Sequence, residues 1–339
     1  MTLRMPAEWA PHDAVWIGFP HMAEEWSGQI DAARRDVAAF ANAVHDGGRG
    51  EKVHLLVRDH DNADIAEALV DEGVQLFVAP FGDIWLRDTG PIIVGTGTRR
   101  KARNFDFNWW GNKFVMPGDR EIGAILAAHA DLPTQHLDWV LEGGGIDVDG
   151  TGLCVTTEEC LLNRNRNPTL TREDIAVRLH QSLGIDRLLW LGDGLIGDHT
   201  DGHVDNLARF VDEGRLALPV ADGDDDPNAH IYADARARGR VRRGRDRRPP
   251  LARPRRIGRR DRGGELYELL YRQQRGGRAD LWRRERRGGG RGARRAVPRT
   301  PRGRRACARH YRGWRQLPLL EPAASGLASR AKPLIFGSI

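Results

Sequence analysis

The charge of the chain reverses near residue 235, and this break limits a packed core to the residues before it. Residues 1–235 contain 20 Lys and Arg against 40 Asp and Glu, a net charge of −20. Residues 236–315 contain 31 Arg, no Lys and 6 acidic residues, a net charge of +25. Poor apolar content and charge repulsion oppose folding of such a segment. We therefore expect an ordered domain over 1–235 and an irregular or disordered Arg/Gly-rich region over 236–339.

Short apolar runs alternate with helical patterns in the first 235 residues, which predicts an α/β fold. Strands are expected at 14–19, 52–58, 74–81, 91–96, 145–150, 153–162 and 186–192. Helices are expected at 31–44, 64–70, 120–128 and 171–183. The last of these begins with T-R-E-D, a capping-box pattern. Residues 206–212 and 215–220 read as a hairpin that turns at Glu213 and Gly214.

Three polar clusters interrupt this pattern. The segment D-I-W-L-R-D-T-G-P, residues 83–91, crowds two carboxylates and a Trp before a strand, and L-E-G-G-G, residues 141–145, sets an acid before three glycines. The third segment is G-D-H-T-D-G-H-V-D-N, residues 197–206. If it is extended, alternate side chains share one face. These are His199, Asp201, His203 and Asp205.

Each cluster also has an interpretation without function: a surface ion pair, a glycine turn or a solvated strand face. Four polar groups on one strand face are nevertheless hard to place in an ordinary core. Together the three clusters therefore favour a functional site.

A guanidinium substrate would need such groups. It is a planar cation that stays protonated at physiological pH, so carboxylates must lie along its edges when it leaves water. Hydrolysis of its C–N bond needs a nucleophile, for which a thiolate is suitable, and a proton donor for departing ammonia. A His beside an Asp can supply that proton and later activate water.

Five motifs in the first 235 residues together resemble those of one known family. M-P-A-E-W near the start, D-I-W-L-R-D-T-G-P, N-F-D-F-N-W-W-G-N-K-F, L-E-G-G-G and G-D-H-T-D-G-H-V-D-N, in this order, resemble the agmatine deiminase family. This resemblance covers residues 5 to about 235. It implies a pentein, a five-bladed α/β propeller related to the protein-arginine deiminases, which is incomplete in this chain.

The resemblance also implies an activity and a set of site residues. The family hydrolyses agmatine to N-carbamoylputrescine and ammonia through a Cys thiol intermediate, a route to putrescine from arginine; peptidyl arginine is an alternative substrate. Two acids would clamp the guanidinium and one imidazole would act as general acid and base: Asp88, Asp205 and His203. Two further acids and two indoles would surround the substrate: Glu142, Asp198, Trp85 and Trp110. No metal or organic cofactor is implied.

The nucleophile of the family is missing from this sequence. In the family it is a Cys near the C-terminus in a G-G-G-x-x-H-C context. Cys307 lies in the corresponding region but within R-R-A-C-A-R-H-Y, and Cys154 and Cys160 are expected to be ordinary buried thiols. We therefore expect impaired activity.

A shifted reading frame explains the missing motif. Back-translation of ELYELLYRQQ (265–274), read one nucleotide forward, permits S-Y-M-N-F-Y-I-G-N, which resembles a stretch of the family. The same shift in HYRGWRQLPLLEPAA (310–324) permits T-I-A-G-G-G-S-F-H-C-S-S-Q-Q. Both segments use one register, which predicts a frameshift between about Ala235 and Glu265.

Two further interpretations remain open. The cluster of His199, Asp201, His203 and Asp205 could hold zinc or manganese in a metallohydrolase. The basic region could bind nucleic acid non-specifically, although aromatic interleaving and a recognisable nucleic-acid fold are not evident in it. We expect no specific nucleic-acid partner and no membrane partner, and the oligomeric state is not indicated. The lack of a signal-peptide pattern at the start, of a spanning apolar run and of a disulfide framework favours a cytoplasmic protein.

Overall fold

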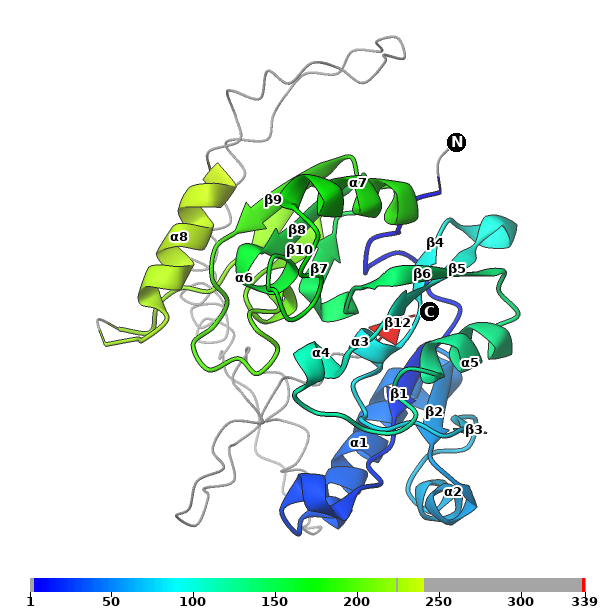
Figure 1. Cartoon of the computed structure of the whole chain (residues 1–339). Helices are drawn as coiled ribbons and strands as arrows, with labels where there is room; N and C mark the ends of the chain where they lie inside the picture. The colour runs from blue at the N-terminus through cyan, green and yellow to red at the C-terminus, as the bar shows by residue number, and fades with distance from the viewer. Residues whose placement is uncertain (1–2, 224, 241–336, 339) are drawn as a thin grey trace, which may run out of the picture. The chain divides into compact units, whose positions relative to one another are not determined.

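The computed structural model describes residues 3–223, 225–240 and 337–338, and all of these belong to one compact unit (Figure 1). Of the basic region expected to be irregular over 236–339, the structure describes only 236–240, which end helix α8 (Ala229–Arg240), and 337–338, which form strand β12 (Gly337–Ser338). Cys307 and the predicted frameshift interval beyond Arg240 lie outside the described residues. Within the described ranges, no helix is long and apolar enough to cross a bilayer.

The first sheet has the strand order β12-β1-β2-β3. Its strands are β1 (Val15–Gly18), β2 (Val53–Val57), β3 (Gln75–Val78) and β12 (Gly337–Ser338). β1, β2 and β3 run parallel, and β12 pairs antiparallel with β1. The helices α1 (Ile30–His45) and α2 (His60–Glu67) pack apolar side chains on one face of this sheet, and α5 (Ile122–His129) packs on the other.

The second and third sheets repeat one pattern, an antiparallel pair followed by a helix and a parallel strand. The second contains β4 (Ile92–Val94), β5 (Lys101–Asp106) and β6 (Thr134–Val140), with α5 between the last two. The third contains β7 (Ile146–Val148), β8 (Leu153–Thr157) and β9 (Arg187–Leu191), with α7 (Arg172–Leu183) before β9. One apolar cluster joins both sheets.

A fourth unit begins with the same pattern. The hairpin of β10 (Arg209–Asp212) and β11 (Arg215–Ala217) is followed by α8 (Ala229–Arg240). The apolar side chains of this unit pack against β8 and β9. The strand that would complete the unit is not among the described residues.

Short helical turns connect these units. They are η1 (Ala23–Trp26), η2 (Asp46–Gly48), α3 (Leu86–Thr89), η3 (Gly97–Arg99), α4 (Trp109–Asn112), η4 (Gly143–Gly145), α6 (Glu158–Leu161) and η5 (Val204–Asn206).

The expected α/β class is confirmed, but two strands of the second sheet, the central β5 and the edge strand β6, were not predicted from the sequence. β5 reads K-A-R-N-F-D and β6 reads T-Q-H-L-D-W-V, and both carry mostly polar, partly exposed side chains. Their pairing in the sheet, rather than their apolar content, makes them strands.

Two imidazoles lie in an aromatic cluster between the first sheet and α5. The ring of His54 stacks on Trp16 at 4.5 Å, and the ring of His129 lies 5.3 Å from His54 and 4.1 Å from Phe77. Burial, with help from Lys52 and His129, lowers the pKa of His54 to about 4. The folded protein therefore holds this imidazole in its neutral form.

The free energy of unfolding should consequently depend on pH through His54. The unfolded chain takes up this proton near pH 6.5, whereas the folded chain does so only near pH 4, so stability falls as the pH drops through this window. We expect a loss on the order of 2 kcal/mol. Urea unfolding at pH 7.5 and 4.5 should show a smaller loss in His54→Phe, which keeps the stacked ring. His136→Phe, at an exposed side chain, is the control; equal losses in all three proteins would contradict the prediction.

Candidate active site

Three short turns bring the polar clusters of the sequence together. α3 precedes β4, η4 precedes β7 and η5 precedes β10, so each turn leads into the first strand of one unit. The turns contact one another in the order α3, η4, η5. Asp88 lies in the first turn, Glu142 at the start of the second, and His203 and Asp205 at and within the third.

Gly144 marks the centre of this cluster. A Cβ atom at Gly144 would lie 2.4 Å from His203 Nδ1, 2.7 Å from Asp205 Oδ2 and 2.7 Å from Asp88 Oδ1. Three polar atoms from turns far apart in the sequence thus face one small volume. All three side chains are buried.

Both oxygens of Asp88 receive hydrogen bonds from the protein. The backbone N–H of Gly144 donates to Oδ1 at 2.9 Å, and the indole Nε1 of Trp110 donates to Oδ2 at 2.9 Å. These donors fix the plane of the carboxylate. Trp110 is itself buried, so its indole supports Asp88 from within the protein.

Trp110 owes its position to a left-handed turn. Four consecutive residues have positive φ: Trp109 at 56°, Trp110 at 55°, Gly111 at 81° and Asn112 at 63°. Left-handed conformation costs about 1–2 kcal/mol for each residue other than Gly, so the surroundings must hold this turn. Asn108 contributes, because its side chain accepts from the N–H of Gly111 at 3.0 Å.

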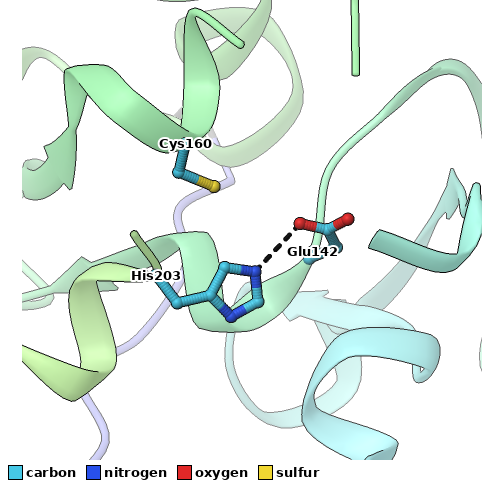
Figure 2. A group of neighbouring side chains, drawn as sticks. All are labelled: Glu142, Cys160 and His203. Atoms are coloured by element: carbon cyan, nitrogen blue, oxygen red, sulfur yellow. Dashed lines mark hydrogen bonds and ion pairs between the residues drawn. The ribbon is translucent and has the colours of Figure 1, made fainter. Parts of the chain in front are cut away.

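Glu142 sets the orientation of His203. The Nε2 atom of His203 lies 2.9 Å from Glu142 Oε2, while Nδ1 lies 3.7 Å from Asp88 Oδ1. Figure 2 shows the carboxylate and the ring meeting through this contact. A carboxylate accepts only, so Nε2 carries a proton and Nδ1 faces the volume at Gly144. Burial opposes a charge on the ring, but Asp88 and hydrogen bonds with Cys160 and Glu142 raise the pKa of His203 well above its ordinary value.

A buried arginine, Arg166, holds Glu142. Its Nε and Nη2 donate to the two oxygens of Glu142 at 2.8 and 3.0 Å, and the remaining N–H groups bind Asn165, Asp201 and the carbonyl of Thr200. All five donors of the guanidinium are therefore satisfied. Sequence analysis missed this residue; its only signal was the polar run N-R-N-R-N-P after the apolar end of α6.

The N-terminal motif M-P-A-E-W lies behind the same cluster. Glu8 accepts from Arg87 in a forked pair at 2.6 and 2.8 Å. Burial opposes the charge of Glu8, but Arg87 lowers the pKa of this carboxyl to about 2. Because Arg87 directly precedes Asp88, this pair anchors the first turn of the site.

Asp198 and Trp85, the remaining expected site residues, lie in the turns next to this cluster. Asp198 holds the 197–206 turn: its oxygens accept from the N–H and hydroxyl of Thr200 and from the N–H of His203. Trp85 is half-buried at the start of α3 and packs against an apolar cluster.

The segment 197–206 is not the extended strand that its alternation predicted. It forms turns followed by η5, and glycines and an Asp with positive φ break the alternation: Gly197, Asp201 and Gly202. The proposed metal ligands are consequently separated. The ring of His199 packs on Phe114, while Asp201 pairs with Lys113 and Arg166.

A different trio, Glu142, Cys160 and His203, has ligand atoms within 4.8 Å of one another (Figure 2). Glu142 is already bound by the guanidinium of Arg166, so a metal cation here would meet a second buried positive charge. We therefore assign no metal to this trio.

The described cysteines are poor nucleophiles. Cys154 and Cys160 are fully buried, and burial raises the pKa of each thiol. A thiol with a raised pKa forms little thiolate at neutral pH.

Known proteins share this fold and sequence. Solved structures include a cysteine-to-serine variant of C. jejuni agmatine deiminase with substrate bound (TM-score 0.65, 29% identity, 70% of each chain covered). Another is agmatine deiminase of Enterococcus faecalis (TM-score 0.64, 29% identity, 70% of this chain and 66% of that one). The repeated sheet-and-helix units with carboxylates around one imidazole are those of the pentein fold.

Sequence relatives identify the family within that class. Residues 4–251 match the profile of the Porphyromonas-type peptidyl-arginine deiminases, and the chain belongs to this family. Agmatine deiminase of Ectopseudomonas mendocina is 39% identical over 232 residues, and that of Stutzerimonas stutzeri is 37% identical over 236. Each alignment covers 66% of this chain, and the chain spans 62% of the length of each relative.

The ionisation of His203 provides a test of the site geometry. We expect the pKa of its imidazole to lie well above the ordinary value and Asp88→Asn to lower it, because Asp88 is the charge that raises this pKa most. NMR titration of ¹³C-labelled histidine measures this, with exposed Asp212→Asn as control. A wild-type pKa near 6.5, unchanged in Asp88→Asn, would show that the two groups do not interact.

Proposed function

We propose that the described region binds the guanidinium of agmatine between Asp88 and Asp205, beside Nδ1 of His203. The observation that carries this proposal is the convergence of these three side chains on Gly144. Carboxylates on two sides suit a planar cation with N–H groups along its edges. The agmatine deiminases among the relatives and solved structures support agmatine as the ligand.

The reaction supported for this family is hydrolysis of agmatine to N-carbamoylputrescine and ammonia. A thiolate adds to the guanidinium carbon, forming a C–S bond, and the C–N bond breaks as protonated His203 gives its proton to the departing nitrogen. Neutral His203 then takes a proton from water. The resulting hydroxide adds to the same carbon. The C–S bond then breaks as the hydroxyl proton is lost to the released ammonia or to solvent, which gives the neutral urea product and returns the thiolate.

The described residues do not supply this thiolate, since Cys154 and Cys160 are buried with raised pKa values. Cys307 lies outside the described residues. We therefore propose that the segment with the nucleophile is encoded in a shifted frame, beginning between about Ala235 and Glu265. The family match ends at residue 251, inside this interval.

Ammonia release should distinguish this chain from its frame-restored form. We expect turnover of agmatine on the order of 10⁴-fold or more below that of a protein translated from a gene corrected within codons 235–265, because the nucleophile is lost. A coupled ammonia assay measures this, and a peptidyl-arginine substrate run in parallel tests the alternative specificity. Resequencing the gene across codons 230–270 is the control. If the uncorrected chain turns over agmatine at an ordinary rate, the hypothesis that it lacks the nucleophile is wrong.

Substitution of Gly144 tests the binding volume itself. Gly144→Ala would place a methyl group among Asp88, His203 and Asp205, so agmatine affinity should fall roughly 100-fold, about 2.7 kcal/mol. Calorimetric titration measures the affinity, and thermal unfolding checks the fold. Gly145→Ala is the matched control, because its methyl group would meet Cys160 and Leu161 instead. If Gly144→Ala and Gly145→Ala bind agmatine with equal affinity, agmatine does not bind beside Gly144.

A further inference from the structure

Asp201 connects two chains of polar contacts, here called arms. One leads to His203 and the other to Asp88. Its Oδ1 lies 2.6 Å from Nζ of Lys113, and its Oδ2 accepts from Nη1 of Arg166 at 2.5 Å and from the side chain of Asn165 at 2.9 Å. Its backbone is left-handed, with φ of 58°.

The first arm leads to the imidazole. Arg166 bridges Asp201 and Glu142, and Glu142 meets Nε2 of His203. The side chains of Arg166, Glu142 and His203 are each only 1% exposed, so their contacts are little screened by water.

The second arm leads to Asp88, one of the two carboxylates proposed to bind the guanidinium. Lys113 directly follows the left-handed turn 109–112, and within this turn Trp110 donates to Asp88. Asn165, held by Asp201, packs against the same turn: a Cβ at Gly111 would lie 2.4 Å from its Nδ2. Asp201 therefore binds the turn through a charge at its end and through packing at its centre.

We propose that Asp201 is a positioning residue that fastens Trp110 and Glu142 together, so that one carboxylate sets both Asp88 and His203. In this role Asp201 acts through Arg166 and Lys113 and not by contact with the substrate guanidinium. Its charge is compensated by Lys113 and Arg166, and loss of that charge releases both arms at once. The proposal deepens the guanidinium-binding function, but its geometric content can be tested without substrate.

The test uses two variants of the full chain and a matched control. Asp201→Asn keeps the shape and tolerates positive φ but removes the charge. Lys113→Met removes the charged contact of the second arm and leaves the first arm, through Arg166, intact. Asp46→Asn is the control, because Asp46 is also left-handed and also pairs with an arginine, Arg49, on an exposed surface.

The readouts are two protons seen by NMR, namely the indole N–H of Trp110, assigned through Trp110→Phe, and the Nε2–H of His203. Asp201→Asn should speed solvent exchange of both by ~10-fold or more through local opening. Lys113→Met should speed exchange at Trp110 alone. The control should leave both unchanged.

If Asp201→Asn folds and the exchange of both protons is unchanged, the proposal is wrong, even if the melting temperature falls. A change at only one of the two protons would overturn it as well. If Asp201→Asn does not fold, Lys113→Met decides: unchanged exchange at Trp110 overturns the proposal, and a selective rise supports it. Agmatine titration of the wild type is read separately. Failure of binding there would refute the proposed function while leaving the two proton readouts valid.

Discussion

The buried pair of Glu142 and Arg166 is the interaction on which the site depends. Asp88, Glu142 and Asp205 are withdrawn from water within one cluster, and uncompensated carboxylates there would be strongly unfavourable. Arg166 binds Glu142 through a forked pair, and this leaves Glu142 able to hold the imidazole of His203. The remaining carboxylates, Asp88 and Asp205, then face the volume that we propose a substrate cation enters.

The fold places these groups by repetition. The second, third and fourth units each begin with a turn that leads into the first strand, and these three turns meet. Side chains more than 100 residues apart in the sequence thereby converge on Gly144, where only a residue without a side chain fits. Strain is concentrated at the same place, in the left-handed turn 109–112 and at Asp201.

Local sequence patterns predicted local structure well. The capping box at Thr171 forms as expected, with Asp174 as its partner, and the hairpin turns at Glu213 and Gly214. The polar strands β5 and β6 were missed because sheet pairing, which is not local, defines them. The clusters containing Asp88, Glu142 and His203 were found, and the structure brings them together.

The roles of Arg166 and Trp110 in that cluster could not be read from the sequence. Arg166 lies in a polar loop that resembles a surface segment, and its burial depends on Glu142 and Asp201 from other units. Trp110 is predicted to lie beside the substrate, and the structure adds a hydrogen bond from its indole to Asp88, within a left-handed turn that the sequence does not indicate. Contacts between distant units carry no signal in the order of residues.

We propose that residues 3–240 hold a guanidinium beside His203 even though the two cysteines among the described residues are buried. The most direct measurement is titration of agmatine into the ¹³C-histidine-labelled chain, followed by NMR at the ring of His203. A saturable shift with agmatine, and none with 1,4-diaminobutane, which lacks the guanidinium, is the predicted result. Equal shifts with both ligands, or no shift with either, would contradict the claim.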